Sequence, residues 1–142
     1  MTVLVEINVV LDVLLNREPF ADASAALWEA IESGRCKGLL PAHAFPTIYY
    51  LIHKERGSGV AKRSIRAMRT VFAVAAVDGE VIDRSLDLDF TDFEDAVTAA
   101  AAEAASADYL LTRDSKGFRN SPVSALPPEA FLAMLERGDT QP

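Results

Sequence analysis

Residues 2–12, TVLVEINVVLD, indicate the fold class of this chain. The β-branched and aliphatic residues 2–7 are typical of a short buried strand, with an acid, Glu6, near its end. Asn8 then stands where a helix cap is expected, before the apolar residues 9–15. A buried strand that passes directly into a helix is the first unit of a parallel α/β sheet.

The rest of the chain continues this alternation of short apolar runs and helical segments. Further strands are expected at residues 38–40, 72–77 and 109–111, and a short fifth strand near 123–126. Helices are expected at residues 22–33, 43–54, 60–71, 80–88, 92–106 and 127–135, with a break at Gly57 to Gly59. Strands that alternate with helices predict a parallel sheet with helices on both faces.

Length and composition favour a single cytoplasmic domain. With 142 residues, half of them hydrophobic, we expect one domain over residues 1–136 and a frayed tail over 137–142. No apolar run approaches the roughly 20 residues of a membrane helix, so no membrane partner is expected. An acid also stands near the N-terminus where a signal peptide would carry basic residues. The single cysteine, Cys36, excludes an internal disulfide and is typical of a reducing compartment.

Charge is unevenly distributed along the chain. The net charge of −7 argues mildly against nonspecific binding to nucleic acid, since polyanions favour basic surfaces. A nucleic-acid enzyme stays open, because part of the acidity could belong to a metal site. Six Lys and Arg residues between Lys54 and Arg69 contrast with the acid-rich segment 78–95. This basic stretch is either a solvated helix face or a patch that faces phosphate or a partner.

Carboxylates stand where strands of the predicted sheet end. Ligands of such sheets bind beyond the carboxyl ends of the strands. Glu6 ends the first strand, and Asp114 follows the fourth. Asp92 and Asp95, three residues apart, share one face of the first turn of an alanine-rich helix. Converging carboxylates suit Mg²⁺ or Mn²⁺, which can activate a water for attack on phosphorus.

Each acid also has a structural explanation. Asp92 and Asp95 could cap their helix and complement its dipole, and Asp114 could be a turn residue. Glu6 follows strand residues and is therefore expected to be partly buried, next to a metal or a basic partner. The two histidines show no zinc spacing and are expected at the surface or in helix packing.

The order of these motifs resembles that of PIN-domain proteins. The resemblance covers nearly the whole chain and rests on residues 3–12 (VLVEINVVLD), 16–20 (NREPF), 92–96 (DFEDA), 107–114 (ADYLLTRD), Phe118 and 126–132 (LPPEAFL). It implies a three-layer α/β/α sandwich with a central parallel sheet of four to five strands. It also implies Mg²⁺- or Mn²⁺-dependent cleavage of RNA by an acidic cluster.

The resemblance assigns roles to particular residues and suggests partners. Catalytic metal ligands would be Glu6, Asp95 and Asp114, with Asp92 as a replacement. Asn8 and Thr112 would orient ligands or water, and Arg113 and Lys116 would contact the phosphate. Many small bacterial members are VapC-type toxins that a cognate antitoxin holds inactive, and they commonly dimerise. An antitoxin partner and a homodimer are therefore expected as well.

Two positions depart from the family pattern. Glu6 stands where the family has aspartate, which places the carboxylate oxygens about an ångström further out. Thr47 stands where many members carry a glutamate. These departures keep a second interpretation open, a catalytically decayed PIN-like module that acts by binding RNA or protein. A third interpretation, a phosphatase, is less favoured, because the sequence lacks the Asp-x-Asp that one large phosphatase class carries after the first strand.

Overall fold

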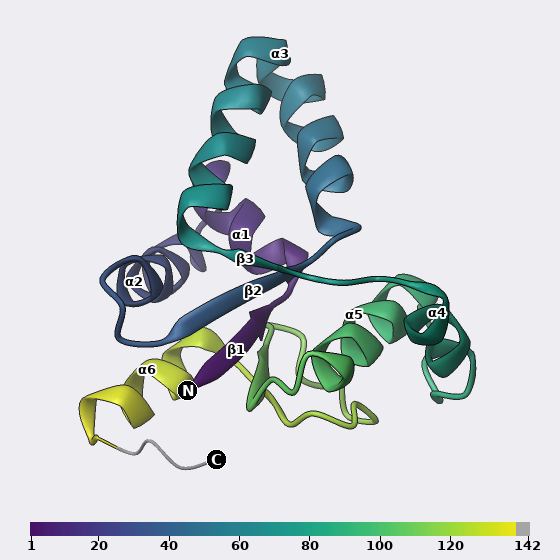
Figure 1. Ribbon diagram of the computed structural model, residues 1–142. Helices are drawn as coiled ribbons and strands as arrows, with labels where there is room; N and C mark the ends of the chain where they lie inside the picture. The colour runs from purple at the N-terminus through teal and green to yellow at the C-terminus, as the bar shows by residue number, and fades with distance from the viewer. Residues whose placement is uncertain (139–142) are drawn as a thin grey trace.

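A five-stranded parallel sheet forms the centre of the molecule (Figure 1). The computed structural model describes residues 1–138. In the order β3-β2-β1-β4-β5, every neighbouring pair is parallel. The strands are β1 Thr2–Val5, β2 Lys37–Pro41, β3 Ala73–Ala75, β4 Tyr109–Leu111 and β5 Ala125–Leu126. The predicted central parallel sheet is confirmed.

Helices cover both faces of the sheet, as predicted. They are α1 Ile7–Leu14, α2 Ala21–Glu32, α3 Ala44–Val71, α4 Gly79–Leu86, α5 Phe93–Ala104 and α6 Pro128–Glu136. One hydrophobic cluster joins α1, α2, α3 and α6 to one face of the sheet, and a second joins α4 and α5 to the other. Alternate residues of β1 serve the two clusters, since Val3 and Val5 face the first and Leu4 faces the second. The result is a three-layer α/β/α sandwich.

The alanine-rich helix α5 lies close against the sheet. Residues 99–102 are four consecutive alanines, all buried. Small side chains allow this close approach, and they pack against Leu4 and Leu110 in the middle of the sheet. The first turn of α5 is thereby held near the strand ends.

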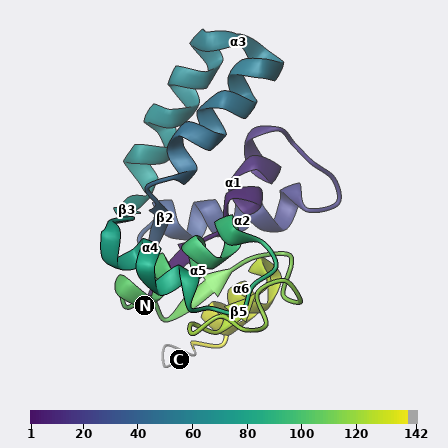
Figure 2. The ribbon, with the colours of Figure 1, turned by 90° about the vertical axis from the view of Figure 1, so that its right-hand side faces the viewer.

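Helix α3 stands out from the body of the molecule (Figures 1 and 2). It consists of two limbs that meet at Gly57, whose φ of +86° and ψ of 171° are not helical. A positive φ costs glycine little, because it has no Cβ. The break predicted at this position is confirmed, and the two limbs spread apart toward the sheet in Figure 1.

The N-terminal boundaries differ from the prediction in one respect. The first strand ends at Val5 rather than at residue 7, and α1 begins at Ile7 with Glu6 as its cap. Asn8 is therefore not the cap but a residue of the first turn. The reason is that the Glu6 carboxylate reaches forward and accepts a hydrogen bond from the Asn8 amide.

Two further expectations concern the C-terminal tail and the absence of a membrane-spanning helix. Of the tail predicted over residues 137–142, the part from 139 onward lies outside the described residues. Within residues 1–138, no helix combines the length and the apolar character that crossing a membrane requires.

Candidate active site

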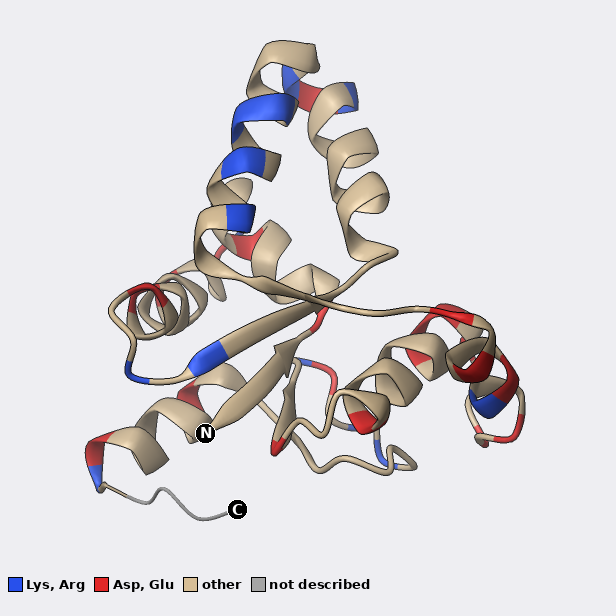
Figure 3. Ribbon diagram, viewed as in Figure 1, with Lys and Arg blue, Asp and Glu red and all other residues tan. Residues whose placement is uncertain are grey.

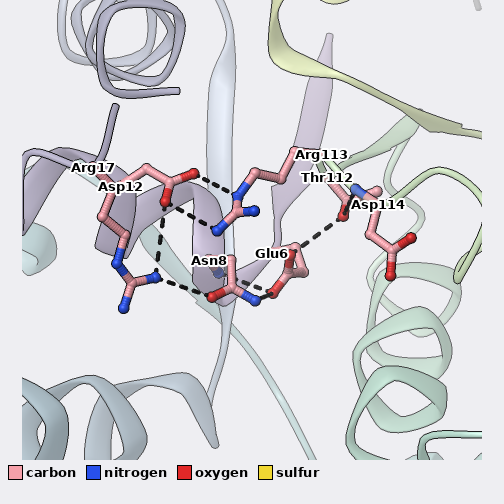
Figure 4. A network of polar contacts seen from close by, with 7 residues as sticks. All are labelled: Glu6, Asn8, Asp12, Arg17, Thr112, Arg113 and Asp114. Carbon is pink, nitrogen blue, oxygen red and sulfur yellow. Dashed lines mark hydrogen bonds and ion pairs between the residues drawn. The ribbon is translucent and has the colours of Figure 1, made fainter. Parts of the chain in front are cut away.

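The carboxyl ends of β1 and β4 bring Glu6 and Asp114 to the same edge of the sheet. The two strands are paired in register, with Val5 opposite Leu111. Thr112 is fully buried, and its hydroxyl donates a hydrogen bond to Oε1 of Glu6 (3.3 Å). The same hydroxyl accepts a hydrogen bond from the amide of Asp114 (3.0 Å) (Figure 4). Thr112 therefore links Glu6, which follows β1, to the turn that carries Asp114.

Glu6 is buried and locally hydrogen-bonded. Only 6% of the residue is exposed. Its Oε2 accepts hydrogen bonds from the backbone amide (2.9 Å) and the side-chain amide (3.3 Å) of Asn8. Burial raises the pKa of Glu6, and the hydrogen bonds from Asn8 and Thr112 oppose this shift. Both carboxylate oxygens are thus held in place by the chain itself.

The first turn of α5 supplies two more acids. Asp92 caps the helix, because its Oδ1 accepts a hydrogen bond from the Asp95 amide (3.0 Å). The Asp95 carboxylate accepts no hydrogen bond from residues 1–138. Burial raises the pKa of Asp95 to about 7, and negative neighbours add to the shift, namely Asp92, Glu6, Asp114 and Glu94. Acids from three separate elements therefore act on one another electrostatically.

A further carboxylate, Asp12 on α1, holds Arg113 and Arg17 near the site. It is fully buried, and Arg113 binds it through Nε (2.8 Å to Oδ2) and Nη2 (3.3 Å to Oδ1). Nη1 of Arg17 lies 3.8 Å from Asp12 and donates a hydrogen bond to Oδ1 of Asn8 (3.3 Å). The Arg113 guanidinium also covers the ring of Phe20 at 4.1 Å. Arg113, expected to contact phosphate, is therefore engaged by Asp12 (Figure 4).

Sequence reasoning did not single out Asp12 as a site residue. A signal was present, since Asp12 is the only charged residue of the apolar helix α1 and lies one turn after Asn8. A charge on the buried side of a helix requires a partner. The partner, Arg113, is 101 residues away in the chain, and only the strand pairing reveals it.

Lys116, which is predicted to contact phosphate, lies near Asp114. Both residues line a cleft of about 320 Å³, together with Asp89, Phe90, Thr91, Gly117, Arg119 and Asn120. Oδ1 of Asp114 accepts a hydrogen bond from the Gly117 amide (3.0 Å), and a Cβ at position 117 would collide with the same carboxylate. The turn therefore needs glycine at position 117 to hold Asp114 in this orientation.

His43, expected at the surface or in helix packing, packs near the acids. It precedes α3 at the carboxyl end of β2, and its Nε2 lies 3.4 Å from Oγ1 of Thr98 on α5. Burial lowers the pKa of His43, with a smaller opposing effect from Glu94. Its buried Nδ1 has no hydrogen-bond partner within residues 1–138. Thr47, one turn later, donates its hydroxyl to the His43 carbonyl (3.1 Å), so this side chain is directed to its own helix.

The acids suit a hard cation in their chemistry but do not form a coordination shell. Mg²⁺ and Mn²⁺ prefer oxygen ligands, and a carboxylate without a Lys or Arg partner can offer them a negatively charged oxygen. In the described part of the chain, no ion pair engages Glu6, Asp95 or Asp114. Equally, no three His, Cys, Asp or Glu side chains among residues 1–138 are grouped so that they could hold a metal ion. The three predicted ligands therefore lie at the carboxyl edge of the sheet and interact electrostatically, but they do not form a metal-binding group.

The fold and the site define a class: α/β proteins with a cluster of acids beyond the carboxyl ends of a parallel sheet. Within it, this chain belongs to the PIN-domain family, because a family model described as PIN domain matches residues 2–116. None of the curated proteins matches the chain.

Several solved structures share the fold. VapBC2 from Rickettsia felis, bound to a DNA fragment from its promoter, has a TM-score of 0.72 at 14% identity and covers 89% of this chain and 98% of its own. FitAcB from Neisseria gonorrhoeae has a TM-score of 0.66 at 15% identity, with 89% and 98% covered. VapC20 from Mycobacterium tuberculosis, a Sarcin-Ricin loop cleaving toxin, has a TM-score of 0.61 at 16% identity, with 76% and 86% covered. At sequence identities this low, the similarity to these structures shows a shared fold only.

Proposed function

We propose that this protein is an endoribonuclease that hydrolyses RNA phosphodiesters with Mg²⁺ or Mn²⁺ at Glu6, Asp95 and Asp114. The observation that supports it best is the gathering of acids from β1, the turn after β4 and α5 at one edge of the sheet. The carboxylates repel one another, and a divalent cation bound among them would offset this repulsion. The similarity in fold to a toxin that cleaves the Sarcin-Ricin loop favours RNA as the substrate.

The chain's own residues hold the reacting groups in this proposal. When bound, the metal supplies an activated water and stabilises the leaving oxygen. Glu6 is oriented by Asn8 and Thr112, as ligating carboxylates commonly are. Asp92 caps the first turn of α5 and is the proposed replacement for one of the three metal ligands. Lys116, beside Asp114 in the cleft, contacts the phosphate.

The biological setting proposed here is a toxin–antitoxin pair. Two of the structures with this fold support it: a toxin–antitoxin complex from Klebsiella pneumoniae and the toxin VapC20. We infer a cognate antitoxin that holds the nuclease inactive, a homodimeric assembly and a cytoplasmic location. Copurification with the product of a neighbouring small gene would test the antitoxin.

Asp95→Asn tests the nuclease proposal. The variant should lose Mn²⁺-dependent cleavage of RNA by about 100-fold or more, since displacement of the ion and its water by an ångström is enough for such a loss. Asp22→Asn is the matched control, because Asp22 also lies in the first turn of a helix, α2, and is exposed. Cleavage is measured with a fluorescent RNA, and the fold is checked by circular dichroism. Full metal-dependent activity in Asp95→Asn would refute this site.

A second function has a specific observation in its favour. The carboxylates among residues 1–138 form no three-ligand group, and Thr47 offers a hydroxyl that is already hydrogen-bonded to His43. Both fit a catalytically decayed PIN-like module that acts by binding RNA or protein. In that case the purified protein would not cleave RNA in Mn²⁺, and Asp95→Asn would leave its affinity for the partner unchanged.

A further inference from the structure

The projecting helix α3, Ala44–Val71, is a basic arm on an acidic protein. Of the 14 Lys and Arg residues of the chain, six lie on this α3 arm, whereas of its 21 Asp and Glu residues only Glu55 does. The rest of the molecule therefore repels polyanions, and the α3 arm attracts them. A chain with a net charge of −7 that acts on RNA needs such a locally positive surface.

The cations of the second limb form an exposed stripe. Lys62, Arg66 and Arg69 are four and three residues apart, so they share one face of the helix, and Arg63 lies beside them. Figure 3 shows the blue segments along this limb. All four are exposed, and within residues 1–138 none of them makes an ion pair. Only Arg69 is committed to the fold, through a hydrogen bond from its Nη1 to the Phe72 carbonyl (2.9 Å).

The first limb adds aromatic surface. Tyr50 is 63% exposed, although a tyrosine usually buries most of its ring. Lys54 follows one helical turn later on the same face. The rings of Tyr49 and His53 stack with their centroids 5.9 Å apart. Exposed rings next to cations are the combination with which proteins bind single-stranded nucleic acid, because bases stack on the rings while cations meet the phosphates.

The α3 arm also begins at the candidate active site. It follows β2 directly, and β2 is the neighbour of β1, whose carboxyl end carries Glu6. His43, the residue before the arm, contacts Thr98 on α5, one turn after Asp95. The first limb therefore starts beside the acids, whereas the second limb, which carries the cation stripe, ends at Val71, at the amino edge of the sheet.

We propose that the α3 arm is a docking surface for the backbone of single-stranded RNA, and that it holds the substrate beside the acids. The proposal deepens the proposed function and rests on it for the nature of the polyanion. An acidic protein segment would also be attracted by the stripe. RNA is favoured because the exposed Tyr50 ring and the start of the first limb at the candidate active site have no role in a purely ionic contact.

The double variant K62Q/R66Q tests the proposal. Neither side chain makes a hydrogen bond or an ion pair within residues 1–138, so the fold should persist. The matched control is R35Q/K37Q, which removes one Lys and one Arg, both exposed and both outside the arm, at the amino edge of the sheet. Binding of a fluorescein-labelled single-stranded RNA of mixed sequence is followed by anisotropy in EDTA, which prevents metal-dependent cleavage, between about 50 and 200 mM salt.

The expected result is a weaker dependence on salt in the arm variant alone. Each phosphate contact to a single strand contributes about 0.7 to the slope of log K against log salt, so K62Q/R66Q should lower the slope by about 1.4. The control should keep the wild-type slope. In Mn²⁺, the arm variant should cleave RNA with a raised KM and an unchanged kcat, because the arm binds the substrate without touching the reacting atoms.

Three outcomes would overturn the proposal. Equal slopes for K62Q/R66Q and wild type would remove the arm from RNA binding, as would the absence of measurable RNA binding by wild type. Loss of binding to a poly-glutamate peptide, with RNA binding intact, would assign the stripe to an acidic protein instead. Cleavage of RNA by the wild-type protein in Mn²⁺ is measured separately. The docking proposal and the nuclease proposal can therefore be refuted independently of each other.

Discussion

At the scale of single residues, the ion pair between Asp12 and Arg113 predicts a measurable contribution to stability. Asp12 is fully buried, and 32% of the Arg113 side chain is exposed. Asp12→Asn leaves the arginine without its charge partner. We expect a loss of roughly 3 kcal/mol in the free energy of unfolding, at the lower end for buried pairs because Arg113 is partly solvated. Urea denaturation measures it.

The matched control is Glu103→Gln, which breaks the exposed pair between Arg84 and Glu103. Its urea midpoint should remain close to wild type, because exposed pairs contribute little. If Asp12→Asn unfolds at the same midpoint as this control, the buried pair does not brace the turn between Thr112 and Asp114.

Asp95 predicts a particular dependence of stability on pH. Its pKa is about 7 in the folded protein, against an ordinary value of 3.8 for an aspartate, so the unfolded chain gives up this proton first. Stability from this group is therefore full below about pH 4 and falls as the pH rises toward 7. Without metal, Asp95→Asn should be more stable than wild type near pH 8 and similar to it near pH 4. Thermal melts in EDTA at both values provide the measurement.

The addition of Mn²⁺ should reverse this order near pH 8. A cation that binds only the folded wild type raises its melting temperature, and Asp95→Asn has lost one ligand. Equal melting curves for wild type and Asp95→Asn at both pH values would show that the pKa of Asp95 is not raised in the folded protein.

At the scale of elements, Gly57 and Gly59 separate backbone strain from helix propensity. Gly57 has a φ of +86°, whereas Gly59 is helical, and a Cβ there would meet only the Arg63 guanidinium, at 3.5 Å. Gly57→Ala should lower the free energy of unfolding by about 1–3 kcal/mol. Gly59→Ala should leave it unchanged or raise it by up to about 1 kcal/mol. Urea denaturation measures both free energies. Equal losses in the two variants would contradict the assignment of the break in α3 to the backbone of Gly57.

Most elements could be predicted from the sequence, because hydrophobic periodicity and Gly or Pro punctuation are local signals. The strand at Tyr109–Leu111 and the break at Gly57 are examples. The start of α1 could not, since it depends on the Glu6 side chain reaching the Asn8 amide, a choice that competes with Asn8 acting as a cap. Patterns of residue type do not distinguish these two arrangements.

The candidate site was predictable in position and less so in detail. The rule that ligands bind at the carboxyl ends of parallel strands places Glu6 and Asp114 at one edge, and the strand pairing agrees. The engagement of Arg113 by Asp12 could not be predicted, because it joins side chains 101 residues apart. The packing of His43 against α5 is equally nonlocal, since it depends on how α3 and α5 meet across the sheet.

At the scale of the whole molecule, charge is divided between a body in which acids outnumber cations and the α3 arm, in which cations outnumber acids (Figure 3). A polyanionic substrate is repelled by the first and attracted by the second. A divalent ion at the acids would make the body locally less negative and would allow a phosphate to approach Glu6 and Asp114. The nuclease account therefore depends on one physical event, the binding of a cation among these carboxylates.

A crystal structure of the protein soaked in Mn²⁺, with anomalous data, tests this event most directly. We predict an anomalous peak at the carboxyl edge of the sheet, about 2.1 Å from oxygens of Glu6, Asp95 and Asp114. A saturating soak that shows no peak among these three residues, or a peak held elsewhere, would contradict the account.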